Sequence, residues 1–235
     1  MRAVWVSLAL LAMFAVAILG LKWYVERDTE PTLGLEELAQ PEFIKTHPEK
    51  TRRAARELLN QAIGARVSGE EADESFQSAC RLASGIEQHL DDPSVNEACR
   101  FYGLLDQSGA GTKRDADRLT DESEAAYRSG KRSDASELAL RALGLYNEIG
   151  DRWGELRVVH LLANIHWVSG EMDEAIAQYN RLLDGAKEVG DRNREAAAVN
   201  NLARIEEWRG NIREAESGYR RVGELGRRHG LARIR

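Results

Sequence analysis

The chain has 235 residues and a net charge of −6 at pH 7, with no overall basic bias. This balance excludes a general attraction to nucleic acid, so we expect no nucleic-acid partner. Aromatic residues make up 6% and only four prolines are present, while Ala, Leu, Arg and Glu dominate. That composition favours helices, and we predict an all-α fold.

Residues 1–25 are predicted to be a signal anchor. Residues 3–21 carry no charge, and as a helix they would extend ~28 Å, about the thickness of a bilayer core. Lys22, Trp23 and Tyr24 follow, and such residues suit the membrane interface. We therefore predict one transmembrane helix, a single-pass topology, and a body on the exported, periplasmic side.

A cleaved signal peptide is the alternative. Ala15-Val16-Ala17 fits the small-residue cleavage pattern after an apolar core. Cleavage would leave a secreted soluble protein, whereas retention would leave an anchored one. Both interpretations direct the chain to a membrane.

Three segments are predicted between the anchor and the clearest repeats. Residues 26–47 contain Pro31, Gly34 and Pro41 and indicate a spacer, with one short helix at Leu35–Leu38. Residues 48–107 show helical periodicity and are predicted to be a helical region, a degenerate repeat. Residues 108–115 are glycine-rich and are predicted to be a linker.

Cys80 and Cys99 flank the turn at Asp91-Asp92-Pro93. In an exported compartment they could face one another across a helical hairpin and form a disulfide. Two buried free thiols are the equal alternative. Their spacing suggests neither a metal site nor a redox motif.

From residue 116 to the C-terminal end, the chain aligns with itself at a spacing of about 40 residues. Glycine is favoured just past a helix end and aspartate can cap the next helix, so Gly150-Asp151 and Gly190-Asp191 predict a stop followed by a start. We predict three helix–turn–helix units in residues 116–235. The aligned positions are Gly130, Gly170 and Gly210; Ala135, Ala175 and Ala215; Arg141, Arg181 and Arg221; and Gly150, Gly190 and Gly230.

These units resemble the tetratricopeptide repeat family in its longer form. The first unit departs from the family pattern, because Glu122 and Ser123 replace a Leu-Gly pair. The resemblance implies an α-solenoid that binds protein or peptide partners, without naming them. The matching residues are Val159, Leu162, Ala163, Gly170, Ala175, Tyr179 and Leu182 in one unit, and Val199, Leu202, Ala203, Gly210, Ala215 and Tyr219 in the next.

No catalytic pattern is found. Ser108 to Lys113 lacks the glycine spacing of a phosphate loop, and His160 and His166 lie on different faces of one helix. We therefore predict no enzyme activity, no cofactor and no metal site.

The first helices of such units line a concave face, where an extended peptide would bind. The candidate partner-binding residues lie on this face, outside the row of apolar residues that packs against the neighbouring helices. The alternative is that Asn164 and Asn201 bond neighbouring helices and the tryptophans fill repeat junctions. The candidates are Arg157, His160, Asn164 and Trp167 in one unit, and Asn200, Asn201, Arg204 and Trp208 in the next.

The C-terminal edge lacks a capping helix, so Val222 and Leu225 would be exposed unless arginines cover them. Self-association through this edge is one expectation. The leading functional hypothesis is a membrane-anchored interaction scaffold or assembly factor. The alternatives are a small-ligand sensor, an accessory subunit of a membrane-associated enzyme or secretion complex, and a secreted protein after signal cleavage.

Overall fold

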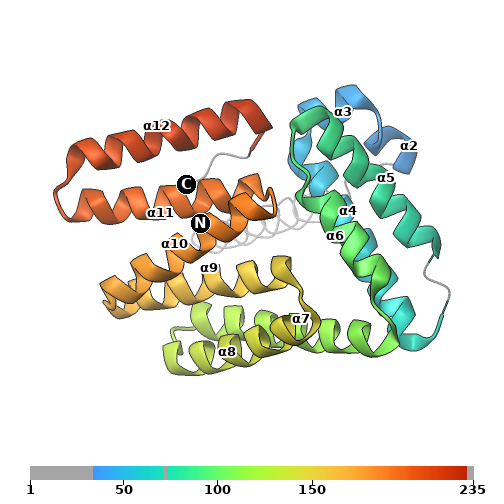
Figure 1. Ribbon diagram of the computed structural model, residues 1–235, viewed down its shortest axis with the longest axis horizontal. Helices are drawn as coiled ribbons and strands as arrows, with labels where there is room; N and C mark the ends of the chain where they lie inside the picture. The colour runs from blue at the N-terminus through green and yellow to red at the C-terminus, as the bar shows by residue number, and fades with distance from the viewer. Residues whose placement is uncertain (1–33, 71–72, 232–235) are drawn as a thin grey trace, which may run out of the picture. The chain divides into compact units, whose positions relative to one another are not determined.

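The computed structural model describes residues 34–70 and 73–231, and within these ranges the elements are helices, without strands (Figure 1). The predicted anchor, residues 1–25, lies outside them. No helix in the described ranges is long and apolar enough to cross a membrane. The chain divides into Met1–Glu37 and Leu38–Arg235, and the second unit is the one described below.

The helices follow one another in chain order, and consecutive helices pack together. The three predicted helix–turn–helix units correspond to the pairs α7–α8, α9–α10 and α11–α12. The helices are α2 (Leu35–Leu38), α3 (Pro41–Thr46), α4 (Pro48–Ser68), α5 (Asp73–Leu90), α6 (Ser94–Leu104), α7 (Gln107–Arg128), α8 (Arg132–Ile149), α9 (Arg152–Ser169), α10 (Met172–Glu188), α11 (Arg192–Trp208) and α12 (Ile212–His229).

The predicted stop and start signals between the pairs are confirmed. Gly150 and Gly190 have φ of 72° and 69°, a left-handed conformation that glycine adopts without steric cost. The Asp151 carboxylate accepts a hydrogen bond from the Gly154 N–H at 2.9 Å, and Asp191 accepts one from the Arg194 N–H at 3.0 Å. Each aspartate therefore caps the helix that follows it.

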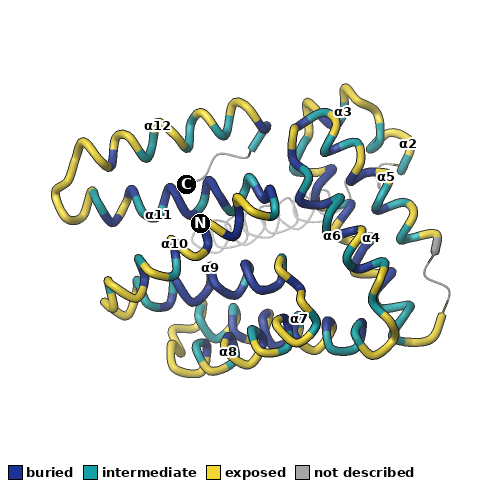
Figure 2. Tube along the Cα trace, viewed as in Figure 1, coloured by how far each residue is buried: buried dark blue, intermediate teal, exposed yellow. Residues whose placement is uncertain are grey.

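The repeated alanines and arginines have matching roles in successive pairs. Ala135, Ala175 and Ala215 are buried, as expected where two helices cross closely. The Arg181 guanidinium donates to Glu155 at 2.6 Å and the Arg221 guanidinium donates to Glu195 at 2.9 Å. Both glutamates are buried near the start of the first helix of their pair, so these ion pairs fasten the second helix to the first. The resulting core runs through α9, which is largely buried (Figure 2).

The predicted glycine-rich linker at residues 108–115 is wrong. These residues belong to α7, which begins at Gln107 and is capped by the Asp106 carboxylate through the Gly109 N–H at 2.7 Å. Ala110 and Lys113 are buried within the segment. Packing of α7 on α4 therefore overrides the low helix propensity of the glycines, and no domain boundary lies here.

The predicted spacer at residues 26–47 is wrong in its last part. Residues 26–33 lie outside the described ranges, and the expected short helix at Leu35–Leu38 is present. However, Pro41–Thr46 forms α3, which packs on α4 and α5. Its Ile44 side chain is 1% exposed, so residues 41–46 belong to the helical body.

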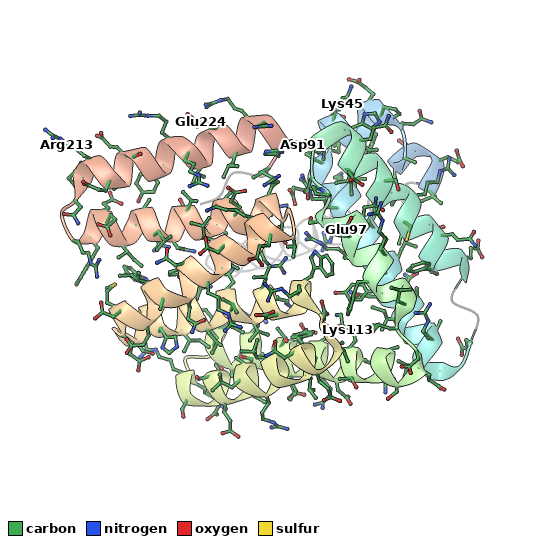
Figure 3. All side chains as sticks on the ribbon, in the orientation of Figure 1. Lys45, Asp91, Glu97, Lys113, Arg213 and Glu224 are labelled. Carbon is green, nitrogen blue, oxygen red and sulfur yellow. The ribbon has the colours of Figure 1, made fainter. Side chains whose placement is uncertain are left out.

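The last helix returns to the first helices of the unit, in an arrangement that we call the closure contact. Arg52 of α4 is fully buried and donates to Asp92 at 2.9 Å and to the carbonyl oxygen of His229 at 3.0 Å. The His229 ring nitrogen lies 3.0 Å from the carbonyl oxygen of Leu90. Figure 3 shows Asp91 close to this end of α12. The closure contact thus joins residues separated by more than half of the sequence.

The closure contact changes the prediction for the C-terminal edge. The end of α12 is covered by α4 and by the loop between α5 and α6 of the same chain, and Val222 and Leu225 are half-buried. Arg213 and Glu224 point outward from α12 (Figure 3). Self-association through this edge stays a prediction, with less apolar surface to support it than the sequence suggested.

Cys80 on α5 and Cys99 on α6 are free thiols; Cys99 is buried and Cys80 is half-buried. Burial raises the pKa of both thiols, so neither is held as a reactive thiolate. The sequence left open a disulfide or two free thiols, and the structure has two free thiols.

Candidate functional site

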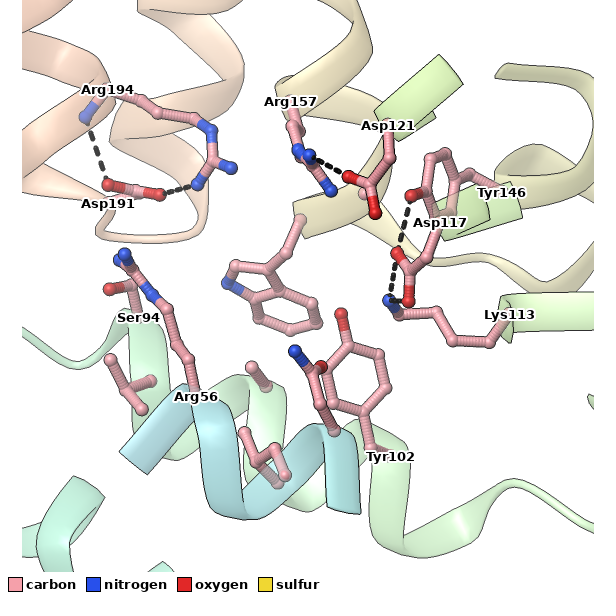
Figure 4. Close-up of a pocket in the computed structure, with 16 residues that line it drawn as sticks. Arg56, Ser94, Tyr102, Lys113, Asp117, Asp121, Tyr146, Arg157, Asp191 and Arg194 are labelled. Carbon is pink, nitrogen blue, oxygen red and sulfur yellow. Dashed lines mark hydrogen bonds and ion pairs between the residues drawn. The ribbon is translucent and has the colours of Figure 1, made fainter. Parts of the chain in front are cut away.

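A cavity of about 470 Å³ lies between the repeat helices and the helices that precede them (Figure 4). Its lining comes from α4, α6, α7, α9 and α11, together with Tyr146 of α8 and Asp191 of the α10–α11 turn. The closure contact holds α4 and the α5–α6 loop against the end of α12. The cavity therefore depends on contacts between distant parts of the sequence.

One wall of the cavity is a buried cation with its partners. Lys113 of α7 is 5% exposed and donates to the Asp117 carboxylate at 2.5 and 2.6 Å. Its ammonium group also lies 3.8 Å from Asp151 and over the rings of Tyr102 and Tyr146. Two carboxylates and two aromatic faces thus compensate for the loss of water around this charge.

The two tyrosines complete this network as neutral donors. The Tyr146 hydroxyl donates to Asp117 at 2.7 Å, and the Tyr102 hydroxyl donates to Asp151 at 3.1 Å. Burial raises the pKa of both phenols, and the neighbouring aspartates raise it further. These hydroxyl groups therefore stay protonated at neutral pH, and their network fixes the wall in one arrangement.

Two arginines also line the cavity, and both are paired within the chain. Arg157 donates to Asp121 at 2.6 Å and to Glu124 at 2.8 Å. Arg194 binds the carboxylate of Asp191, which also caps α11. Both arginines are half-buried, so they present donors to the cavity while their charge is largely neutralised.

A second cavity of about 270 Å³ adjoins the first and shares Arg157 and Arg194 with it. His160 and Asn164, two of the predicted partner-binding residues, line it. The two cavities together form a polar inner face that runs from α4 to α9 and α11. A chain in extended conformation could contact both.

Five of the eight predicted partner-binding residues lie close to one another in the structure. The His160 ring nitrogen lies 3.5 Å from the Asn201 amide nitrogen, and the Arg204 guanidinium donates to the Asn201 amide oxygen at 3.2 Å. Arg204 also lies over the Trp167 ring at 5.9 Å. Asn164 accepts a hydrogen bond from the Tyr179 hydroxyl at 2.6 Å. Part of the Asn164 and Asn201 hydrogen-bonding capacity is thus used within the chain, as the alternative interpretation expected.

Two candidates lie elsewhere. Asn200 is buried, with 9% of its surface exposed, so it offers little surface to a partner. Consecutive helix residues are about 100° apart, and Asn201 takes the inner face instead. Trp208 is 71% exposed at the last residue of α11; like Trp167, Asn201 and Arg204, it lines neither cavity.

The cavity also contains residues that the sequence did not identify as functional. Arg56, Asn60 and Tyr102 come from the region expected to be a degenerate repeat, and Lys113 from the expected linker. A local signal was available for one of them, since Lys113 and Asp117 are four residues apart, a spacing that allows an ion pair along a helix. No cluster of His, Cys, Asp or Glu suited to a metal ion occurs among the residues the structure describes.

His160 provides a test of the inner-face electrostatics. Burial and the nearby Arg194 guanidinium lower the pKa of His160 to about 4, against 6.5 for a free histidine. Because the pKa of His160 is lower in the folded than in the unfolded protein, the neutral ring contributes to stability. That contribution is present above pH 6.5 and is lost as the pH falls toward 4. We expect the imidazole to titrate near pH 4 by NMR, and the free energy of unfolding to fall by about 2 kcal/mol between pH 7 and pH 5 from this group.

The variant His160→Gln is the control for that measurement. It should remove this part of the pH dependence while leaving the contribution of other groups unchanged. A His160 titration midpoint above pH 6 in the folded protein would contradict the burial of this ring among the inner-face cations.

The consecutive helix pairs define the described body as an α-solenoid. A family model for the tetratricopeptide repeat matches residues 155–225, which cover α9 to α11 and most of α12. The match and the helix pairs together support the tetratricopeptide repeat family, as the sequence resemblance predicted. No curated protein matches the chain.

Proposed function

We propose that this protein is held at a membrane by residues 3–21 and binds a segment of a partner protein along its inner face, as a scaffold or assembly factor. Tetratricopeptide repeats are typically non-catalytic interaction modules, and residues 155–225 match that family. The observation that carries the proposal is the pair of adjoining cavities joined by Arg157 and Arg194. The apolar sequence of residues 3–21 supports the membrane location, with the body on the exported side.

The chemistry of the inner face suits a polypeptide ligand. Beside the second cavity, where the Asn201 amide lies 3.5 Å from His160, half-buried Asn201 and exposed Arg204 offer an amide and a guanidinium next to the Trp167 ring. An amide can both donate to and accept from a peptide backbone, and an indole ring provides apolar contact area. This combination gives affinity for an extended chain with a limited demand on its sequence.

The test is chemical crosslinking and pull-down of the full-length protein from carbonate-washed native membranes. We compare wild type with Asn201→Ala/Arg204→Ala, which removes inner-face donors without disturbing the Asn164–Tyr179 hydrogen bond. The matched control is Arg141→Ala/Asn147→Ala, which removes the same residue types from exposed positions on α8. Loss of a charged and a neutral hydrogen bond is expected to weaken partner capture by about tenfold or more.

The outcomes separate the two parts of the proposal. Release of the chain by the carbonate wash would contradict the anchor alone. Equal recovery of partners with the inner-face variant and the control would contradict the inner-face assignment alone.

A small-ligand sensor is the second candidate, because the larger cavity has a volume in the range that holds small molecules. In that case the cavity would bind its ligand in the absence of any protein partner. Binding of a small molecule without capture of proteins by the inner face would favour this candidate.

A further inference from the structure

The chain contains two cysteines, and they lie on the neighbouring helices α5 and α6. Cys80 is half-buried and Cys99 is buried, and the structure holds both in the reduced form. Neither of them lines the two cavities. Because the sequence contains no third cysteine, each has only the other as a disulfide partner within the chain.

Two contacts fix the register of α5 against α6, which are joined by a short turn. At one level, the Phe76 ring of α5 lies against Gly103 of α6, where a Cβ added to the glycine would be 2.6 Å from the ring. At the other level, the Ser84 hydroxyl of α5 lies 3.5 Å from the side-chain oxygen of Asn96 on α6. The two helices therefore run antiparallel, with these two pairs of residues facing one another.

The cysteines lie midway between these two contacts. On α5, Cys80 is one helical turn beyond Phe76 and one turn before Ser84. On α6, Cys99 is likewise about one turn from each of the facing residues, Asn96 and Gly103. Burial, and then the Cys80 thiol, raise the pKa of Cys99, as expected for groups that are neighbours. The register thus places the two thiols opposite each other.

We propose that Cys80 and Cys99 form a disulfide in the exported protein and that this bond fastens α6 to α5. The exported location rests on the proposed function, and exported compartments are oxidising enough for disulfides to persist. Helix α6 has only 11 residues, fewer than an isolated helix needs to be stable. It carries Tyr102, which donates to Asp151 in the cavity wall. The bond therefore holds one side of the cavity in place.

The different burial of the two thiols sets the order of the reaction. An external disulfide, of a protein or of a small molecule, reaches the half-buried Cys80 first. The Cys80 thiolate attacks it, forms a mixed disulfide and releases one thiol. The Cys99 thiolate then attacks the Cys80 sulfur and releases the second thiol. The oxidant is thereby reduced to two thiols, which take up the two protons that the cysteines lose.

The test is the thiol state of the full-length protein in its native membranes. Cells are quenched with acid, and free thiols are labelled with a polyethylene glycol maleimide before or after reduction, so that each labelled thiol retards the chain on a gel. We expect no label before reduction and two labels after it. One or two labels before reduction would overturn the proposal. The variant Cys80→Ala/Cys99→Ala, which takes no label, is the control.

A stability measurement on the purified full-length chain in detergent tests the fastening of α6. Oxidised glutathione should raise the Tm of wild type by about 5–10 °C, because the bond closes a loop of about 20 residues in the unfolded chain. The Tm of Cys80→Ala/Cys99→Ala should not respond to the oxidant. An equal or lower Tm of oxidised wild type would overturn the fastening, since it would mean that the bond distorts the helix pair.

Single variants test the order of the two attacks. Cys99→Ala retains the half-buried thiol, and mass spectrometry should detect its mixed disulfide with glutathione. Cys80→Ala retains the buried thiol and should stay unmodified. The reverse pattern would overturn the order. The Tm of each variant under reducing conditions checks that it folds.

Protease added to right-side-out membrane vesicles separates this inference from the exported location. A digested body with the disulfide would support both, and a digested body with free thiols would overturn the disulfide alone. A protected body with the disulfide would overturn the exported location alone. A protected body with free thiols would overturn both.

Discussion

Replacing Arg52 by alanine is expected to lower the free energy of unfolding by about 3–5 kcal/mol, the cost of breaking a buried ion pair by removing one partner. The Arg52 side chain has no exposed surface, and it binds Asp92, which is 1% exposed. It also donates to the carbonyl oxygen of His229 at the end of α12. The variant would leave the Asp92 charge buried and would break the closure contact, so urea denaturation should report a large loss.

Arg53→Ala is the matched control, because the adjacent arginine is 81% exposed and pairs with an exposed Glu57. We expect that variant to lose less than about 1 kcal/mol. Hydrogen exchange should also show faster exchange at the end of α12 in Arg52→Ala but not in Arg53→Ala. Equal stability of the two variants would mean that α12 does not close onto α4.

Replacing Gly154 by alanine is the second change expected to have a large effect, with a loss of about 3 kcal/mol. A methyl group at this position in α9 would overlap the ring of Tyr146. That ring has no room to move, because it is fully buried and its hydroxyl is bonded to Asp117 and lies 3.2 Å from Thr120. Thermal unfolding should therefore show a clear fall in Tm, together with distortion of the cavity wall.

Gly144→Ala gives the opposite expectation in the neighbouring helix. Position 144 is exposed in α8 and nothing lies within 4 Å of an added methyl group. Alanine should stabilise that helix by about 0.5–1 kcal/mol, because glycine has the higher conformational entropy in the unfolded chain. A destabilised Gly144→Ala, or an unaffected Gly154→Ala, would contradict the packing of α8 against α9.

The repeats could be predicted from the sequence because their signals are local. Gly150-Asp151 and Gly190-Asp191 each specify a helix end and the next helix start within two residues. Repetition of these signals at one spacing gave the helix pairs and their order. The structure adds the ion pairs that explain the repeated arginines at positions 181 and 221.

The region before residue 116 was predicted less well, because its structure depends on distant contacts. The glycines at 109 and 111 suggested a linker, but packing against α4 keeps them helical. Arg52 and Arg53 cannot be told apart by residue type. Their positions along the helix could have distinguished them, because Arg52 lies on the same helix face as the buried Ala55 and Leu59. A charged side chain on an apolar helix face needs a buried partner.

Whether the predicted binding residues meet a partner stays a prediction, but their grouping could be read from helical phase. Positions off the packing stripe of α9 and α11 do form a connected group, which includes His160, Asn201 and Arg204. Asn200 is buried and Asn201 is not, because neighbouring helix residues point about 100° apart. The place of Arg56 in the cavity wall could not be predicted, because it depends on α4 facing α11, which no repeat pattern encodes.

The central claim is that a partner contacts the inner face between α4 and α11. Its most direct test is photocrosslinking in native membranes, with benzoylphenylalanine in place of Asn60 in the cavity or of Asn147 on the outer helix α8. We predict a crosslinked protein from position 60 that is absent from position 147. Crosslinks from position 147 with none from position 60 would contradict the claim.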